Sequence, residues 1–143
     1  MIDREALECK LASIESNLML LGPLSGMTDA EFDGDVRNRY TALHLLQVSI
    51  EAMLDCVEHV IARMRLGAPS DGREAWLLMR DHGLLPAEHV RTYLVMNAFR
   101  NRVVHLYDEV SVEEVKRILR EDLGDFGLFI ADVRALYAKA AKD

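Results

Sequence analysis

The chain has 143 residues, of which 50% are hydrophobic and 29% are charged, and its formal net charge is −7. This composition suits one compact domain spanning residues 1–143, while the acidic balance argues against a general nucleic-acid coat, whose affinity comes from cations on phosphates. Cys9 and Cys56 stand alone in the sequence, so we expect reduced thiols. The start lacks a signal-peptide pattern and no apolar run approaches bilayer length, so we expect a cytoplasmic protein with no membrane partner.

Helical periodicity dominates the first half of the chain. Apolar residues recur every three or four positions from about residue 3 to residue 21, and Gly22-Pro23 is expected to end this helix. A longer helical pattern runs from about residue 35 to residue 66, and a glycine and a proline follow it closely. The sequence therefore predicts two long amphipathic helices before residue 70.

A row of polar residues follows the long second helix. Gln47, Glu51, Asp55 and His59 recur every four residues beside its apolar face. Such a row is costly unless it faces water or a polar cleft. A di-iron site is the alternative, but no histidine here has a glutamate three residues before it, as those sites require. We therefore predict polar support for a cleft or a wet interface, and no metal site.

Helical patterns continue through the second half. A short helix is expected after residues 70–72, and a longer one from Pro86 to about residue 106. After a turn, Ser111 and Glu114 have the spacing of a capping box at the start of the next helix.

Two glycines mark the last expected interruption of the helical pattern. Gly124 and Gly127 predict a break or kink before a final helix. No segment alternates with a period of two over a useful length, which argues against strands. The predicted fold is an all-α, antiparallel, up-and-down bundle of four to six helices.

A group of polar side chains closes the helix that ends near residue 106. The segment has the pattern R-x-x-x-x-H-x-Y, formed by Arg100, His105 and Tyr107, and Asn101 and Arg102 follow the arginine. Arginine offers fixed charge and forked donors suited to phosphate, whereas histidine exchanges protons near neutral pH. Arg100 and His105 are about 140° apart around an ideal helix, so we expect them to line a cleft between two surfaces. This combination points to phosphodiester chemistry.

The motif in its all-helical context resembles the signature of HepT-like toxins of the HEPN superfamily. The resemblance covers nearly the whole chain, and the polar row on the long helix is similar to their second helix. It implies a HEPN-like homodimer whose paired motifs form a metal-independent endoribonuclease acting on cellular RNA, either tRNA or mRNA. It further implies that Arg100 stabilises the scissile phosphate and His105 carries protons, with Asn101 and Arg102 in support. No cofactor is expected for the nuclease itself.

The same resemblance implies a partner protein. An MntA-like nucleotidyltransferase antitoxin is expected to use ATP and magnesium to attach AMP to the motif tyrosine, here Tyr107. The modification adds bulk and negative charge beside the cleft and so opposes RNA binding. The alternative interpretation is a noncatalytic helical adaptor, or substrate-binding partner of the transferase, that keeps the motif as a binding and modification site.

Overall fold

The computed structural model describes residues 2–142 and, at the C-terminal end, side chains up to residue 139. Within this range the chain forms seven α-helices and two short helical turns, with no strand. The helices are α1 (Arg4–Ser25), α2 (Asp29–Asp33), α3 (Val36–Met64), α4 (Gly72–Asp81), α5 (Ala87–His105), α6 (Val112–Arg117) and α7 (Gly124–Lys142), and the turns are the 3-10 turn η1 (Tyr107–Glu109) and the π-helical turn η2 (Ile118–Asp122). The all-α prediction is confirmed. The count exceeds the expected four to six by one because α2 is a short helix separate from α3.

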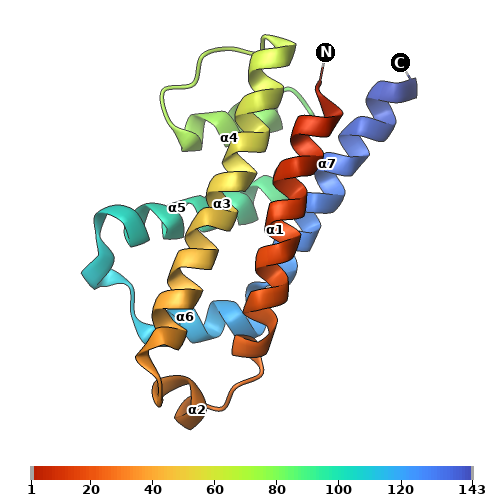
Figure 1. Ribbon diagram of the computed structural model, residues 1–143. Helices are drawn as coiled ribbons and strands as arrows, with labels where there is room; N and C mark the ends of the chain where they lie inside the picture. The colour runs from red at the N-terminus through yellow and green to blue at the C-terminus, as the bar shows by residue number, and fades with distance from the viewer. Residues whose placement is uncertain (1, 143) are drawn as a thin grey trace.

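The longer helices surround one hydrophobic core. α1 and α3 run antiparallel side by side, and α7 lies beside α1 (Figure 1). α5 instead runs across these helices and packs against α3, α4 and α7, and its C-terminal end projects beyond α3 (Figure 1). The up-and-down arrangement therefore describes α1, α3 and α7, whereas α5 is set across them.

The first helix continues past the expected stop at Gly22-Pro23 and ends at Ser25. Leu21 and Leu24 are buried on either side of this pair, so core packing stabilises the last turn. Proline removes the hydrogen bond to the carbonyl four residues before it, and its ring crowds that carbonyl. That carbonyl lies in a solvent-exposed turn, where water can replace the lost donor.

The interruption near the two glycines occurs slightly earlier than predicted. The chain passes from α6 through η2, and α7 then starts at Gly124 and includes Gly127. The hydroxyl of Ser111 accepts a hydrogen bond from the Glu114 N–H at 3.1 Å. The Glu114 carboxylate binds Arg102, so the second half of the expected capping box is not formed.

An aromatic cluster fixes the N-terminal half of α5. Trp76 of α4, Tyr93 of α5 and Phe129 of α7 are all fully buried, with ring centroids 5.1–5.6 Å apart. The Tyr93 hydroxyl donates a hydrogen bond to Asp132 at 2.5 Å, and the same carboxylate lies 2.9 Å from His89 Nδ1. Burial, reinforced by Asp132, raises the pKa of Tyr93, so its hydroxyl remains a donor. This cluster anchors α5 to both α4 and α7.

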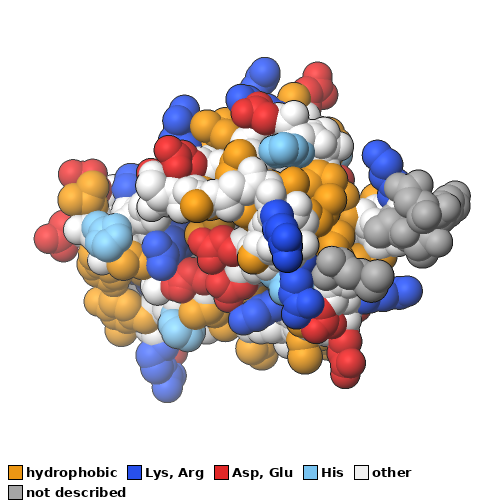
Figure 2. Space-filling view, turned by 90° about the horizontal axis from the view of Figure 1, so that it is seen from above, with side chains coloured by type: hydrophobic (Ala, Val, Ile, Leu, Met, Phe, Trp, Pro, Cys, Tyr) orange, Lys and Arg blue, Asp and Glu red, His pale blue; other side chains and the backbone are white. Residues whose placement is uncertain are grey.

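Charged and apolar side chains are distributed unevenly over the surface of the molecule. On the end that carries both termini, acidic and basic side chains are interspersed (Figure 2). Large apolar side chains are exposed at Met19 and Leu20 of α1, and at Tyr40, Leu106 and Tyr107 near the start of α3 and the end of α5. The described helices include none that is both long enough and apolar enough to cross a membrane.

Candidate functional site

The motif lies at the projecting end of α5. Arg100 and Asn101 lie in its last turns, His105 is its final residue and Tyr107 opens η1. The helix ends because Leu106 leaves the helical region, at φ −133° and ψ 47°, while its N–H still bonds to the carbonyl of Arg102. The turn directs the segment after His105 away from the helix axis.

Arg100 is held by two partners. Its Nη1 donates to Asn101 Oδ1 at 3.1 Å, and its Nη2 lies 3.5 Å from Glu51 Oε1 on α3. Glu51 also accepts a hydrogen bond from Gln47 Nε2 at 3.0 Å. The Nε of Arg100 is buried and has no hydrogen-bond partner within the described part of the chain. The two partners orient the guanidinium. Because 27% of the arginine side chain is still exposed, a ligand can reach it.

The polar row of α3 divides between two neighbours. Gln47 and Glu51 join Arg100, whereas Asp55 pairs with Lys10 of α1 at 3.0 Å, and His59 Nε2 accepts a hydrogen bond from the N–H of residue 3 at 3.1 Å. Each step of four residues turns about 40° around a helix, so the row winds from the side of α5 to the side of α1. Only its first half therefore belongs to the motif site. Nowhere in the described range do three or more histidine, cysteine, aspartate or glutamate side chains gather as a metal site would require.

His105 is exposed on the last turn of α5. Asn101 lies one turn before it, but the Asn101 oxygen accepts from Arg100. The amide oxygen thus orients the arginine and leaves the imidazole free to meet a ligand. Arg100 is anchored and His105 is open, and these are the properties expected of a phosphate-binding group and a proton carrier.

Arg102 points to a different part of the molecule. Its guanidinium forms a two-pronged ion pair with Glu114 at 2.7 and 2.8 Å and lies 5.7 Å from the centre of the Phe99 ring. The pair raises the pKa of Arg102 and lowers that of Glu114, chiefly through these hydrogen bonds. Arg102 therefore braces α5 against α6.

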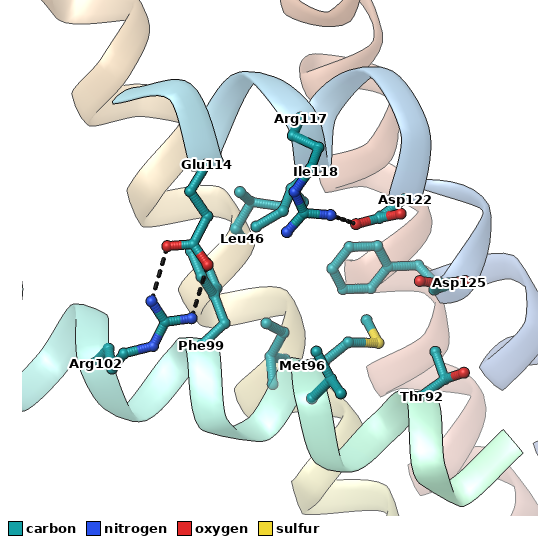
Figure 3. Close-up of a pocket in the computed structure, with 13 residues that line it drawn as sticks. Leu46, Thr92, Met96, Phe99, Arg102, Glu114, Arg117, Ile118, Asp122 and Asp125 are labelled. Atoms are coloured by element: carbon teal, nitrogen blue, oxygen red, sulfur yellow. Dashed lines mark hydrogen bonds and ion pairs between the residues drawn. The ribbon is translucent and has the colours of Figure 1, made fainter. Parts of the chain in front are cut away.

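The Arg102–Glu114 pair borders a mostly apolar pocket of about 240 Å³, shown in Figure 3. Phe99 and Met96 of α5 face Leu46 of α3 across it. Neither Arg100 nor His105 lines this pocket, so the candidate site and this apolar pocket are separate features.

Tyr107 has an aromatic neighbour that the sequence did not indicate. Its ring is parallel to that of Tyr40, with 6.5 Å between centroids and 5° between planes. Desolvation, followed by the adjacent Tyr40 hydroxyl, raises the pKa of Tyr107. The sequence analysis missed Tyr40 because the two residues are far apart in the chain. In the sequence, Tyr40 is recognisable only as an aromatic residue near the start of a predicted helix.

One copy of the site is chemically incomplete for RNA cleavage by internal attack. That reaction needs a base for the 2′-hydroxyl, an acid for the leaving oxygen and a cation for the charge on phosphorus. The described motif end offers one histidine beside Arg100, since Arg102 is paired with Glu114. A second copy related by a twofold axis would supply the missing proton carrier.

Comparison with known proteins gives consistent results. The profile of the family described as "Ribonuclease HepT-like" matches residues 12–133. The mRNA nuclease HepT of Shewanella oneidensis is 25% identical over 126 residues, which cover 88% of this chain and 94% of that protein. The tRNA nuclease HepT of Aphanizomenon flos-aquae is 23% identical over 91 residues, covering 64% of this chain and 62% of that protein.

Solved structures share the fold. A tri-AMPylated HEPN toxin of Shewanella oneidensis, in complex with an MNT antitoxin, superposes with a TM-score of 0.85 at 24% identity, covering 93% of this chain and 99% of that one. A toxin–antitoxin structure with AMP-PNP gives the same TM-score at 23% identity, covering 92% and 99%. These superpositions show that the chain shares its overall fold with those proteins.

Proposed function

The chain belongs to the HepT-like ribonuclease family, and from this premise we propose that it is the endoribonuclease toxin of a toxin–antitoxin pair. The observation that carries the proposal is the pairing of an anchored but reachable arginine, Arg100, with an exposed histidine, His105, at the free end of α5. Two relatives named as RNA nucleases, which align with 88% and 64% of the chain, support the same activity.

The proposed reaction needs two protomers. The imidazole of His105 from one protomer takes the proton of the 2′-hydroxyl, whose oxygen attacks phosphorus. The second His105, in its protonated form, gives a proton to the 5′ oxygen as the bond from that oxygen to phosphorus breaks. Arg100 stabilises the charge that develops on the phosphate oxygens, and the products are a 2′,3′-cyclic phosphate and a free 5′-hydroxyl. No step requires a metal ion.

Glu51 has two opposed effects in this scheme. Together with Asn101 it aims the guanidinium of Arg100, yet its negative charge competes with phosphate for the same group. RNA binding is therefore expected to loosen the contact between Arg100 and Glu51.

Purified protein, incubated with cellular RNA in the presence of a chelator, tests the activity. We expect cleavage, and we expect Arg100→Ala and His105→Ala each to abolish it and to abolish toxicity on expression. Arg91→Ala on the exposed face of α5 removes an equal charge and should retain both. Sequencing of the new RNA ends identifies the class of RNA cut. Cleavage only after addition of a divalent metal ion would refute the mechanism, and harmless wild-type protein would favour the adaptor alternative.

We further propose that a nucleotidyltransferase antitoxin, using ATP and magnesium, silences the nuclease by attaching AMP to Tyr107. The exposure of this residue beside the site, and the AMPylated state of the Shewanella toxin, support the proposal. Tyr107→Phe should stay toxic when the antitoxin is co-expressed, whereas Tyr40→Phe should be modified and silenced like the wild type. Modification that persists in Tyr107→Phe would assign the acceptor to another residue.

A further inference from the structure

Two half-exposed tyrosines, one of them the motif tyrosine, lie with their rings parallel. Tyr40 belongs to the first turns of α3 and Tyr107 to the turn that follows His105, and 54% and 38% of the two residues are exposed. Their planes differ by only 5°, and the 6.5 Å between their centroids is close to the upper limit of about 7 Å for an aromatic pair. The two rings are therefore parallel, and the exposed part of each is open to a planar ligand.

The surroundings of this pair suit a nucleotide. Val36, one turn before Tyr40, and Leu106, next to Tyr107, are both exposed and make an apolar border. Arg39 places its guanidinium beside the segment after η1, where its Nη2 donates to the carbonyl of Val110 at 3.3 Å. Apolar rings for a base and an arginine for a phosphate thus meet at residues 107–110, which follow His105 in the chain.

We propose that Tyr40 and Tyr107 form a stacking platform that holds a base of the RNA substrate next to the scissile phosphate. The inference rests on the proposed ribonuclease function and adds Tyr40 as a substrate-binding residue. Exposed aromatic side chains that accompany a cation bind single-stranded nucleic acid by stacking, largely independent of sequence. The platform supplies affinity for bases, which Arg100 and His105 alone do not provide.

The test separates base binding from backbone binding. Two fluorescent probes are compared: a short 2′-O-methyl oligoribonucleotide, which lacks the attacking hydroxyl, and an abasic oligomer with the same phosphates. Tyr40→Ala should weaken binding of the first probe by about 5- to 150-fold, the range associated with one lost base stack, and leave binding of the second unchanged. Tyr40→Phe keeps the ring and should bind as the wild type does. Met64→Ala removes exposed apolar area from the opposite end of the same helix without removing a ring, and it should change affinity by less than about twofold.

Several outcomes would overturn the platform. These are equal affinity of Tyr40→Ala and wild type for the base-containing probe, an equal loss on the abasic probe, or failure of Tyr40→Phe to restore binding. A change in the oligomeric state of Tyr40→Ala, measured by light scattering at the binding concentration, would assign the surface to a second copy of the chain instead.

Failure of the platform can be told apart from failure of the nuclease proposal. Normal cleavage by Tyr40→Ala with an unchanged KM would reject the platform and leave the nuclease in place. Base-dependent binding by a wild-type protein that cuts no RNA would support the platform and reject the nuclease proposal.

Discussion

Replacing Glu51 by glutamine should strengthen RNA binding, even though it removes a partner of Arg100. The substitution keeps the size of the side chain and an oxygen that can accept from Gln47. It removes the negative charge 3.5 Å from Arg100 Nη2. A phosphate approaching the site then no longer competes with a carboxylate for the guanidinium.

The size of this effect follows from the geometry of the pair. Two unit charges at this distance interact by about 5 kcal/mol at an effective dielectric constant of about 20 and by about 1 kcal/mol in water. The side chains of Arg100 and Glu51 are 27% and 30% exposed, so solvent screening moves the interaction toward the lower figure, roughly 1–2 kcal/mol. The expected gain in affinity is about 5- to 30-fold.

Fluorescence anisotropy with a 2′-O-methyl oligoribonucleotide measures the change without cleavage. Affinity should rise in Glu51→Gln, and the plot of log affinity against log salt should steepen by up to about 0.7, the slope of one further neutralised phosphate on a single strand. In cleavage assays KM should fall. We expect kcat to be unchanged or lower, because the guanidinium loses one of its two anchors.

Glu58→Gln is the matched control, because it removes the same charge from an exposed position on the same helix. Its affinity should stay within about twofold of the wild type, since a screened surface charge contributes little. Unchanged or weaker binding by Glu51→Gln, or an equal gain in Glu58→Gln, would show that Glu51 does not compete for Arg100 and would refute the reasoning.

Three further predictions concern stability. Glu114→Gln should lower the free energy of unfolding by about 1 kcal/mol at neutral pH. Arg102 depresses the folded-state pKa of Glu114, so this stabilisation is present above about pH 4.3 and is lost as the pH falls through the depressed value. In urea unfolding, the difference between wild type and variant should therefore shrink steadily as the pH is lowered below about 4.3. Asp132→Asn, which weakens a nearly buried acceptor with two partners, should cost roughly 1–3 kcal/mol and lower Tm by about 3–10 °C; an unaltered melting curve would count against the network. Gly72→Ala would place a Cβ 2.9 Å from Asn97 Oδ1. The clash should cost roughly 1–3 kcal/mol, more than the helix-propensity gain of about 1 kcal/mol, so Tm should fall. A rise in Tm would show that the buried amide can move aside.

The sequence predicted those features that depend on local patterns. The ends of α3 and the hydroxyl cap at Ser111 follow from periodicity and from capping residues within a few positions. The continuation of α1 past Pro23 was missed because it depends on the burial of Leu24, a tertiary effect that overrides local propensity. Local rules therefore placed the helices well but failed where packing decides.

The candidate site divides in the same way. The three motif residues are recognisable in sequence because they are close together on one helix end. The pairing of Arg100 with Glu51, and the contact between Tyr40 and Tyr107, join segments distant in the chain, and only the crossing of α5 over α3 brings them together. The role of Arg102 was also unpredictable, because its partner lies on the next helix.

The two halves of α5 are held by different kinds of contact, and this affects how the protein can lose its activity. The N-terminal half is fixed by a buried aromatic cluster, while at the motif end Phe99 and Val103 are buried and Arg100 and His105 make only partly exposed contacts or none. Changes at Arg100 or His105 should therefore disarm the chain without unfolding it. Under the proposed toxin function, survivors among cells deprived of the antitoxin should frequently carry full-length, well-folded, inactive copies of the protein.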